Sequence, residues 1–311
     1  MVTTSCSTRV LYIGSWGRSG STLLDLLLGQ LPGFVSVGEL RYLWERGLAE
    51  RQLCGCGSPV PDCPFWRAVL EEAFGGTSLV YAEEVLGLWK RVDGLARIPL
   101  LLAPKGQPAN DKDMRALREV LGRLYRAVGT VSGASTVVDS SKYASYGLLL
   151  AGVPGLELRL LHLVRDSRAV AYSWRRRQVM PEVTTERRYM PLKQPWRSAL
   201  FWELENLGLE LLRRSAVRSA RLRYEDLTSD PRRCLSQALA TVGVEADLDF
   251  LQGRLVHLGQ NHTVAGNPLR FRRGEVTIEP DLEWRRRLGG GSRWVVTALT
   301  WPLLVRYGFR P

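Results

Sequence analysis

The sequence predicts an α/β fold in three layers around a central parallel sheet, and two patterns carry this prediction. Short apolar runs that end in polar residues alternate with segments of helical spacing, which is the arrangement of strands and helices in a parallel sheet. A glycine-rich turn also joins the first expected strand directly to a helix. We therefore expect functional side chains at the carboxyl ends of the strands.

The expected strands are short and buried. The first runs into the glycine-rich turn, and leucines at helical spacing follow from Leu23 to Leu31. The other strands are predicted where an apolar run closes on polar residues. The five expected strands cover residues 10–13, 34–37, 136–138, 158–164 and 220–223. A long helix is expected over residues 196–214.

We expect a single domain over residues 1–311, with two segments set apart from the sheet. Residues 40–135 are mostly helical and polar-faced in pattern, and they are interrupted at Gly75-Gly76 and by a Pro/Gly/Asn-rich stretch at 104–110. This pattern predicts a helical insertion or lid. The charged stretch 175–196 is expected to form a loop on the substrate side.

The composition is that of a folded and basic protein. Its 311 residues include 43 Lys+Arg against 31 Asp+Glu, a formal net charge of +12, and 45% hydrophobic residues. This balance excludes a disordered or low-complexity chain. The positive charge predicts an anionic partner or substrate.

The apolar runs and the cysteines bear on the cellular compartment. The longest apolar run, residues 294–305, has 12 residues, fewer than the roughly 20 that a membrane-spanning helix needs. Residues 1–13 lack the pattern of a signal peptide, and the five cysteines are an odd number. We therefore expect a soluble, cytoplasmic protein without stable membrane insertion.

The glycine-rich turn is suited to binding a phosphate, so the predicted fold is P-loop-like. Backbone N–H groups at the start of a helix bind a phosphate, and guanidinium and hydroxyl groups add donors. The contributing residues are Gly17, Arg18, Ser19, Gly20, Ser21 and Thr22. A Walker A loop carries a lysine after its last glycine, where Ser21 stands here. The alternative is a plain helix start capped by Ser21 or Thr22.

Two segments resemble the sulfotransferases that use 3′-phosphoadenosine-5′-phosphosulfate (PAPS). Residues 17–23 resemble the 5′-phosphosulfate loop of that family, in the form with Arg found in carbohydrate and tyrosylprotein sulfotransferases. Residues 163–173 resemble its 3′-phosphate segment, a strand followed by Arg165 and, eight residues later, Ser173. The motifs occur in the family's order, and the resemblance extends over about residues 10–284. It implies that PAPS is the donor and that both segments contact it.

Three residues outside the glycine-rich turn are assigned to the nucleotide. Arg165 and Ser173, about two helical turns apart, can present a guanidinium and a hydroxyl to one phosphate; the alternative is a surface ion pair of Arg165 with Asp166. Tyr224, after the last expected strand, resembles the family's residue near the adenine and the 3′-phosphate.

A basic segment near the C-terminus is similar to the one that closes over the 3′-phosphate in cytosolic sulfotransferases. It contains Arg270, Arg272 and Arg273 and is followed by Trp284. The resemblance assigns these arginines to the nucleotide. Simple surface charge is the alternative for any one of them.

Sulfuryl transfer needs a base and positive groups that stabilise the transferred and leaving groups. The resemblance to tyrosylprotein sulfotransferases implies Glu39, in a Gly-Glu segment, as the base, and Lys142 together with Arg18 as the stabilising groups. The alternatives are a carboxylate that serves only as a helix-dipole partner and a solvated lysine. The three histidines, His162, His257 and His262, do not stand where cytosolic sulfotransferases place their base.

Three cysteines are candidate zinc ligands, but the sequence does not support a zinc site. Cys54, Cys56 and Cys63 lie close together, but a closed site needs four ligands, and neither a histidine nor a fourth cysteine is near in sequence. We therefore predict free thiols and no metal. The segment from His262 to Pro268 resembles one common in bacterial members, expected near the nucleotide or the lid.

The sequence thus predicts a PAPS-dependent sulfotransferase that needs no metal. A small-molecule kinase with an atypical phosphate loop is the alternative. Nucleic-acid binding is not expected, because the basic motif residues stand at strand ends rather than on one face interleaved with aromatics. A small-molecule or glycoside acceptor is expected, and Trp16 and Trp44 are candidates for lining its pocket. The sequence carries no signal for oligomeric state.

Overall fold

The computed structural model of the protein describes residues 7–76, 79–102, 112–215 and 217–310. Five parallel strands form the central sheet in the order β2-β3-β1-β4-β5. The strands are β1 (Thr8–Gly14), β2 (Phe34–Gly38), β3 (Thr136–Lys142), β4 (Leu156–Val164) and β5 (Arg218–Arg223). They occur where the sequence predicts strands, so the expected α/β fold with a central parallel sheet is confirmed.

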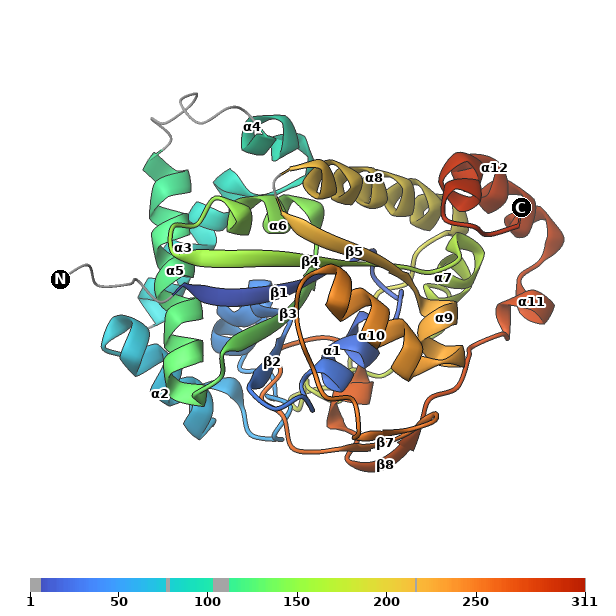
Figure 1. Cartoon of the computed structure of the whole chain (residues 1–311). Coiled ribbons are helices and arrows are strands. Elements are labelled where there is room, and N and C mark those ends of the chain that lie inside the picture. The colour runs from blue at the N-terminus through green and yellow to red at the C-terminus, as the bar shows by residue number, and fades with distance from the viewer. Residues whose placement is uncertain (1–6, 77–78, 103–111, 216, 311) are drawn as a thin grey trace.

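The side chains of β1 divide the core between the two faces of the sheet. Val10 and Tyr12 pack on one face and Leu11 and Ile13 on the other, because successive strand residues point to opposite sides. All four are fully buried. Figure 1 shows α6 and α8 above the sheet and α1 and α10 below it, which gives the three predicted layers. These helices are α1 (Ser21–Leu28), α6 (Ala144–Ala151), α8 (Pro195–Arg214) and α10 (Pro231–Thr241).

Between β2 and β3 the described chain is mostly helical, apart from the turn over residues 50–59. Helices α2 and α3 both pack against α5, at the left of Figure 1. Gly75, with a φ of +68°, ends α2 at the predicted Gly75-Gly76 interruption. The stretch 104–110 lies outside the described residues. The elements are η1 (Leu40–Tyr42), the π-helical η2 (Leu43–Ala49), η3 (Val60–Asp62), α2 (Pro64–Phe74), α3 (Leu79–Val92), η4 (Leu95–Arg97), α4 (Ile98–Leu102) and α5 (Lys112–Ser132).

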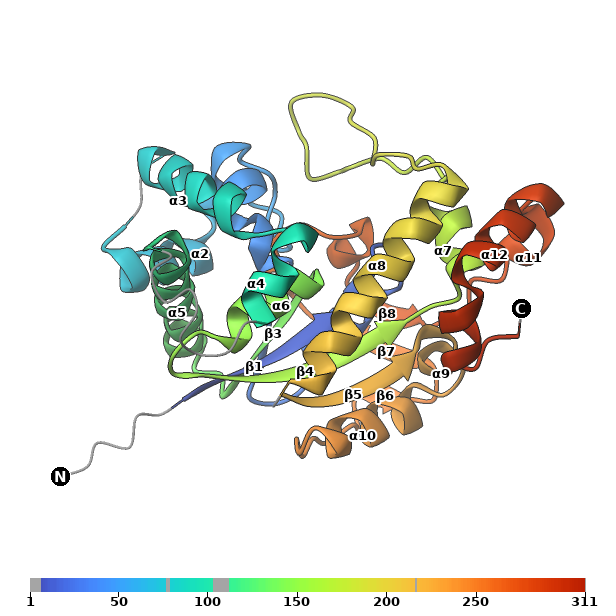
Figure 2. The ribbon, with the colours of Figure 1, turned by 90° about the horizontal axis from the view of Figure 1, so that it is seen from above.

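A long loop joins α7 (Ser167–Ser173) to α8. It has neither helix nor strand, and a bridge between Val179 and Tyr189 ties its two limbs together. Figure 2 shows this loop in yellow-green, extending away from the sheet above α8. It corresponds to the charged stretch 175–196, and α8 covers the long helix predicted over 196–214.

The C-terminal part adds a small antiparallel sheet that the sequence did not indicate. Its strands have only two to four residues, too few for a period of two to stand out. None of the described helices combines the length and the apolar character needed to cross a bilayer. The remaining elements are α9 (Tyr224–Ser229), β6 (Leu251–Gln252), β7 (Leu255–Leu258), η5 (Pro268–Phe271), β8 (Gly274–Thr277), α11 (Trp284–Arg287) and α12 (Gly290–Arg306).

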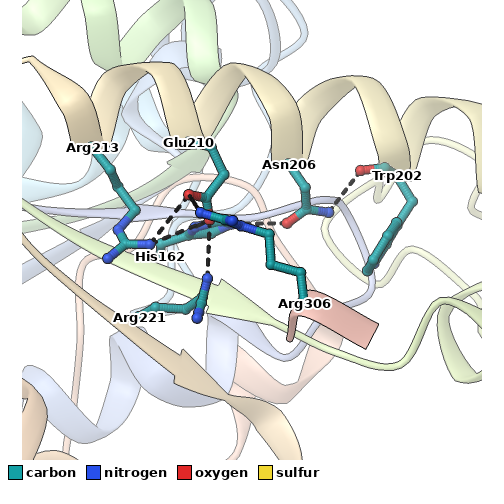
Figure 3. A network of polar contacts seen from close by, with 7 residues as sticks. All are labelled: His162, Trp202, Asn206, Glu210, Arg213, Arg221 and Arg306. Carbon is teal, nitrogen blue, oxygen red and sulfur yellow. Dashed lines mark hydrogen bonds and ion pairs between the residues drawn. The ribbon is translucent and has the colours of Figure 1, made fainter. Parts of the chain in front are cut away.

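A buried polar network fastens α8 to β4. His162 on β4 donates from Nε2 to Oδ1 of Asn206 at 2.8 Å, and the Asn206 amide donates to the Trp202 carbonyl at 2.7 Å. The other ring nitrogen of His162 lies 3.7 Å from Oε1 of Glu210. Figure 3 shows that Glu210 is shared by arginines from α8, β5 and α12. These arginines are Arg213, Arg221 and Arg306.

This environment predicts a pH dependence of stability. Burial lowers the pKa of His162 to about 4, from an ordinary value of 6.5, and the three arginines already compensate the charge of Glu210. The unfolded chain therefore takes up a proton at His162 as the pH falls below 6.5, whereas the folded chain does so only near 4. The stability contribution is complete above pH 6.5 and is lost as the pH falls toward 4.

Denaturant unfolding of the parent and of His162→Gln at pH 7 and pH 5 tests this expectation. The parent is expected to lose about 2 kcal/mol more than the variant between the two pH values, at about 1.4 kcal/mol for each pKa unit. The glutamine amide can still donate to Asn206. An equal loss in both proteins would contradict a neutral, buried His162.

Candidate active site

All five strands of the central sheet end at one edge, and each leads to a residue or loop that the sequence assigned to the site. The glycine-rich loop follows β1, Glu39 follows β2, Lys142 ends β3, Arg165 follows β4 and Tyr224 follows β5. This convergence is the general consequence of parallel pairing. Together these elements line a cavity of about 460 Å³. The assigned residues that line it are Gly17, Arg18, Gly20, Ser21, Thr22, Glu39, Lys142, Arg165, Ser173, Tyr224 and Arg272.

The glycine-rich loop turns sharply into α1 because two of its residues have left-handed backbone. Gly20, the N-cap of α1, has a φ of +92°, and Arg18 has a φ of +72°. A Cβ at Gly20 would lie 2.4 Å from the ring of Tyr224, so a larger residue does not fit. No described side chain caps α1, which leaves its first amides for an anion.

Glu39 is held by a strand-like contact with the segment after residue 260. Its N–H donates to the Val264 carbonyl at 2.7 Å, and the Val264 N–H donates to Val37 at 2.8 Å. The intervening Gly38 has a φ of +72°, and a Cβ there would lie 2.6 Å from the Val264 oxygen. This close approach explains why a glycine precedes the glutamate. Glu39 is 6% exposed, and its carboxylate lies on the cavity.

Lys142 pairs with Glu39 across the cavity wall. Nζ of Lys142 forms an ion pair with Oε1 of Glu39, and Lys142 has a left-handed φ of +78°. Asp139 holds the backbone turn before Lys142 in place, because its carboxylate accepts from the Ser141 N–H at 2.6 Å and from the Tyr125 hydroxyl. Strained backbone of this kind costs about 1–3 kcal/mol and concentrates at functional sites.

Arg165 is positioned by four groups around it. Its guanidinium lies over the ring of Tyr224 at 4.3 Å, donates to the Arg18 carbonyl at 3.1 Å, and pairs with Asp281 at 3.1 Å. Its own carbonyl accepts from Nε1 of Trp202 at 3.0 Å. Arg165 is 5% exposed, so the alternative of a surface ion pair with Asp166 does not describe it. Asp166 instead caps α7 by accepting from the N–H of residue 168.

The cavity fits a ligand with anionic groups. Six basic side chains line it against three acidic ones among the described residues: Arg18, Arg46, Lys142, Arg165, Arg176 and Arg272 against Glu39, Glu279 and Asp281. Several buried polar atoms of the assigned residues have no hydrogen-bond partner in the described chain: Nη2 of Arg18, Oγ of Ser19 and Nε of Arg165. Buried donors of this kind normally have partners, so these atoms are available to a bound anion.

Two sulfotransferases of known structure are similar to this chain in backbone fold. One is the sulfotransferase domain from the curacin biosynthetic pathway, with a TM-score of 0.48 and 19% identity over 94% of this chain and 96% of that one. The other is sulfotransferase STF9 from Mycobacterium avium, with a TM-score of 0.41 and 16% identity over 77% of this chain and 64% of that one. No protein-family model and no curated protein matches the sequence.

The structure adds cavity residues that sequence reasoning missed. Gln178, from the long loop, accepts from Arg18 and lies 3.3 Å from the Asn267 amide. Trp174 lies beneath the Arg18 guanidinium at 5.1 Å, and Asp281 pairs with Arg165. No motif marks these positions. Asn267 had a signal, because it belongs to the segment that the resemblance placed near the nucleotide, and its N–H donates to the Thr22 hydroxyl at 3.2 Å.

Two of the three C-terminal arginines do not reach the cavity. Arg270 is fully buried, and its guanidinium donates to the carbonyls of Thr263 at 2.8 Å and Leu53 at 2.7 Å. Arg273 donates to the Cys56 carbonyl at 3.0 Å. The cavity does not support the assignment of these two residues to the nucleotide, because neither of them lines it. Arg272 lines the cavity.

The cysteines are free, as predicted, but the fold adds a candidate ligand that the sequence did not indicate. The prediction rested on the absence of a fourth ligand near in sequence, whereas the fold brings His262 to Cys54, Cys56 and Cys63, with all four candidate ligand atoms within 4.8 Å of one another. Sequence distance hid this cluster, since about 200 residues separate its two parts. Trp44 does not line the cavity but is buried against Phe74 and Tyr81, whereas Trp16 lines the cavity.

Proposed function

We propose that the protein is a PAPS-dependent sulfotransferase that transfers the sulfuryl group to a hydroxyl or amine of a small-molecule or glycoside acceptor. The observation that carries the proposal is the convergence of the motif residues on one cavity. The phosphosulfate-type loop, the Glu39–Lys142 pair and the Arg165–Tyr224 pair come from five different strands. Parallel pairing brings the strand ends to one edge of the sheet, and the proposal is supported because these residues also line the same cavity.

The donor would lie along the sheet edge from β1 to β5. The loop amides, with Arg18, Ser21 and Thr22, suit the 5′-phosphosulfate. Arg165 and Ser173 suit the 3′-phosphate, with Tyr224 beside them, and Arg272 adds charge from the other wall. The unpartnered donors of Arg18 and Arg165, both of which line the cavity, support an anion at both ends of this path.

Glu39 and Lys142 would carry the chemistry. Glu39 accepts the acceptor's proton as its oxygen or nitrogen bonds to sulfur, while the bond between sulfur and the 5′-phosphate oxygen breaks. Lys142 and Arg18 neutralise the negative charge on the transferred group and the leaving phosphate, which departs as 3′-phosphoadenosine-5′-phosphate. The Glu39–Lys142 ion pair holds the carboxylate of the proposed base next to the lysine that would stabilise the leaving group.

The acceptor would enter beside the long loop. Trp16, Tyr143, Trp174, Met180 and Met190 line this part of the cavity, and Trp16 stacks on Phe201 at 5.5 Å. Aromatic walls of this kind bind the apolar faces of sugars and small rings while polar groups orient them. This supports a small molecule or glycoside.

Calorimetric titration with 3′-phosphoadenosine-5′-phosphate, ADP and ATP, each with and without Mg²⁺, tests the proposal. We expect binding of the first that is independent of Mg²⁺ and at least about 30-fold tighter than binding of ADP, because a phosphate paired with a buried arginine contributes about 2 kcal/mol or more. Preference for ATP with Mg²⁺ would instead identify a kinase. No binding of any of the three would contradict both functions.

A further inference from the structure

The cluster of Cys54, Cys56, Cys63 and His262, here called the cysteine–histidine cluster, lies apart from the proposed chemistry. None of its members lines the cavity. The sulfurs of Cys56 and Cys63 are 3.7 Å apart. Nδ1 of His262 lies 3.3 Å from the Cys63 sulfur and 3.8 Å from that of Cys54.

These separations match the edges of a tetrahedral zinc site. With Zn–S bonds of about 2.3 Å and Zn–N bonds of about 2.0–2.1 Å, tetrahedral angles place two sulfurs about 3.8 Å apart and a sulfur and a nitrogen about 3.5 Å apart. A disulfide would require sulfurs about 2.05 Å apart, and the cysteines here are free. We propose that the cysteine–histidine cluster binds a structural zinc ion.

The backbone around the cysteines is already shaped as a metal-binding turn. The Cys54 N–H donates to the Ser58 carbonyl and the Gly57 N–H to the Cys54 carbonyl, both at 2.8 Å, and Gly57 has a left-handed φ of +97°. Cys63 is the N-cap of α2, where the helix dipole favours a thiolate. The three sulfurs are therefore positioned by the turn and the helix start.

The histidine is oriented independently of the cysteines. The ring of Phe65 stacks on His262 at 4.8 Å, and the indole of Trp66 donates to the His262 carbonyl at 2.9 Å. The neighbouring backbone closes the site, since the Gly55 N–H donates to the Thr263 carbonyl at 2.9 Å. These contacts hold the His262 ring with Nδ1 facing the sulfurs of Cys54 and Cys63.

Charge around the cluster also favours a thiolate-bound metal. Three thiolates and a neutral histidine on Zn²⁺ leave a net charge of −1. Arg273 donates to the Cys56 carbonyl, and the guanidinium of Arg270 bonds the backbone on either side of the cluster, at Leu53 and Thr263. The two arginines that do not reach the nucleotide cavity therefore lie where they offset this charge. Soft thiolate ligands in tetrahedral geometry select zinc over the harder divalent ions.

A zinc ion here would couple the cysteine turn to the active-site wall. The ligand His262 is two residues before Val264, which pairs with Gly38 beside Glu39. It is also four residues before Gly266, which lines the cavity. The ion would thus anchor the segment that holds Glu39 in place, which defines a structural role rather than a chemical one.

Metal analysis of the purified full-length protein tests the proposal directly. We expect about one zinc per chain by mass spectrometry of the metal content, as for a four-ligand structural site. Exchange with Co²⁺ should give the visible absorption of tetrahedral cobalt with a thiolate charge-transfer band. Removal of zinc by a chelator should lower the melting temperature by several degrees.

Variants separate the ligand set from general folding effects. Cys63→Ser and His262→Ala should lose at least about 100-fold in zinc affinity, more than loss of a supporting contact costs. His262→Cys, which retains four ligands, should keep the metal. Cys234→Ser, whose sulfur lies outside the cluster, is the matched control and should keep both zinc and melting temperature. A metal-free or iron-bound parent, a Cys56–Cys63 disulfide, or unchanged stability after zinc removal would overturn the proposal.

Discussion

Glu39→Gln is expected to lower the turnover number by about 10²–10⁴-fold, because general-base catalysis contributes a factor of that size. The amide preserves the shape of the side chain and can still accept from Lys142, but it cannot take up a proton at neutral pH. Nucleotide binding should therefore remain, since the loop and Arg165 are untouched. Steady-state turnover with an identified acceptor, together with calorimetric binding of 3′-phosphoadenosine-5′-phosphate, measures both effects.

The matched control for this variant is Glu45→Gln. Glu45 lies six residues further along the chain, in η2, but it is exposed and does not line the cavity. It should leave both turnover and binding unchanged. Glu39 would lose its assignment as the base if Glu39→Gln turned over at the parental rate, or if its rate loss were matched by Glu45→Gln.

Arg165→Ala is expected to weaken binding of 3′-phosphoadenosine-5′-phosphate by about 2 kcal/mol or more, about 30-fold. The guanidinium is buried, and its Nε has no partner in the described chain, so a bound phosphate would supply one. Binding of ADP, which lacks the 3′-phosphate, should change much less. Calorimetry with both nucleotides tests this difference.

Two further variants check the role of Arg165. Arg232→Ala removes an arginine whose ion pair with Asp249 is exposed and should not alter either affinity. Asp281→Asn removes the carboxylate that competes with a phosphate for Arg165 and should not weaken binding. Equal affinity of the parent and Arg165→Ala for both nucleotides would make Arg165 purely structural.

The sequence was sufficient to predict the sheet because each buried strand leaves a local signal. Residues 34–37 and 158–164 are mostly apolar, interrupted by Ser36 in the first segment and by Arg159 and His162 in the second, and the structure places β2 and β4 there. The small C-terminal sheet left no such signal, since β8 reads Gly-Glu-Val-Thr and is only partly buried. Its position depends on pairing with β7 and packing near α1.

The residues of the cavity also divide into those that the sequence could predict and those that it could not. Arg18, Glu39, Lys142, Arg165 and Tyr224 were predictable, because each stands in a motif at the end of a strand. Asp281 and Gln178 were not, because they enter the cavity from loops whose course is set by distant packing. Arg270 is the opposite case, a motif residue that does not reach the cavity. It belongs to a basic motif, but its guanidinium is buried and donates to two backbone carbonyls.

The sequence by itself determined the order of strands and helices along the chain, the phosphate-type loop and the residues at the strand ends. These features depend on local periodicity and on short motifs. The tertiary structure alone decided which arginines face the cavity and which cysteine partner lies nearby. Cys63 and His262 are 199 residues apart in the chain, and tertiary contacts bring the two segments together, among them the pairing of Gly38 with Val264 and the hydrogen bond from Trp66 to the His262 carbonyl. Contacts of that range arise from packing and leave no local pattern.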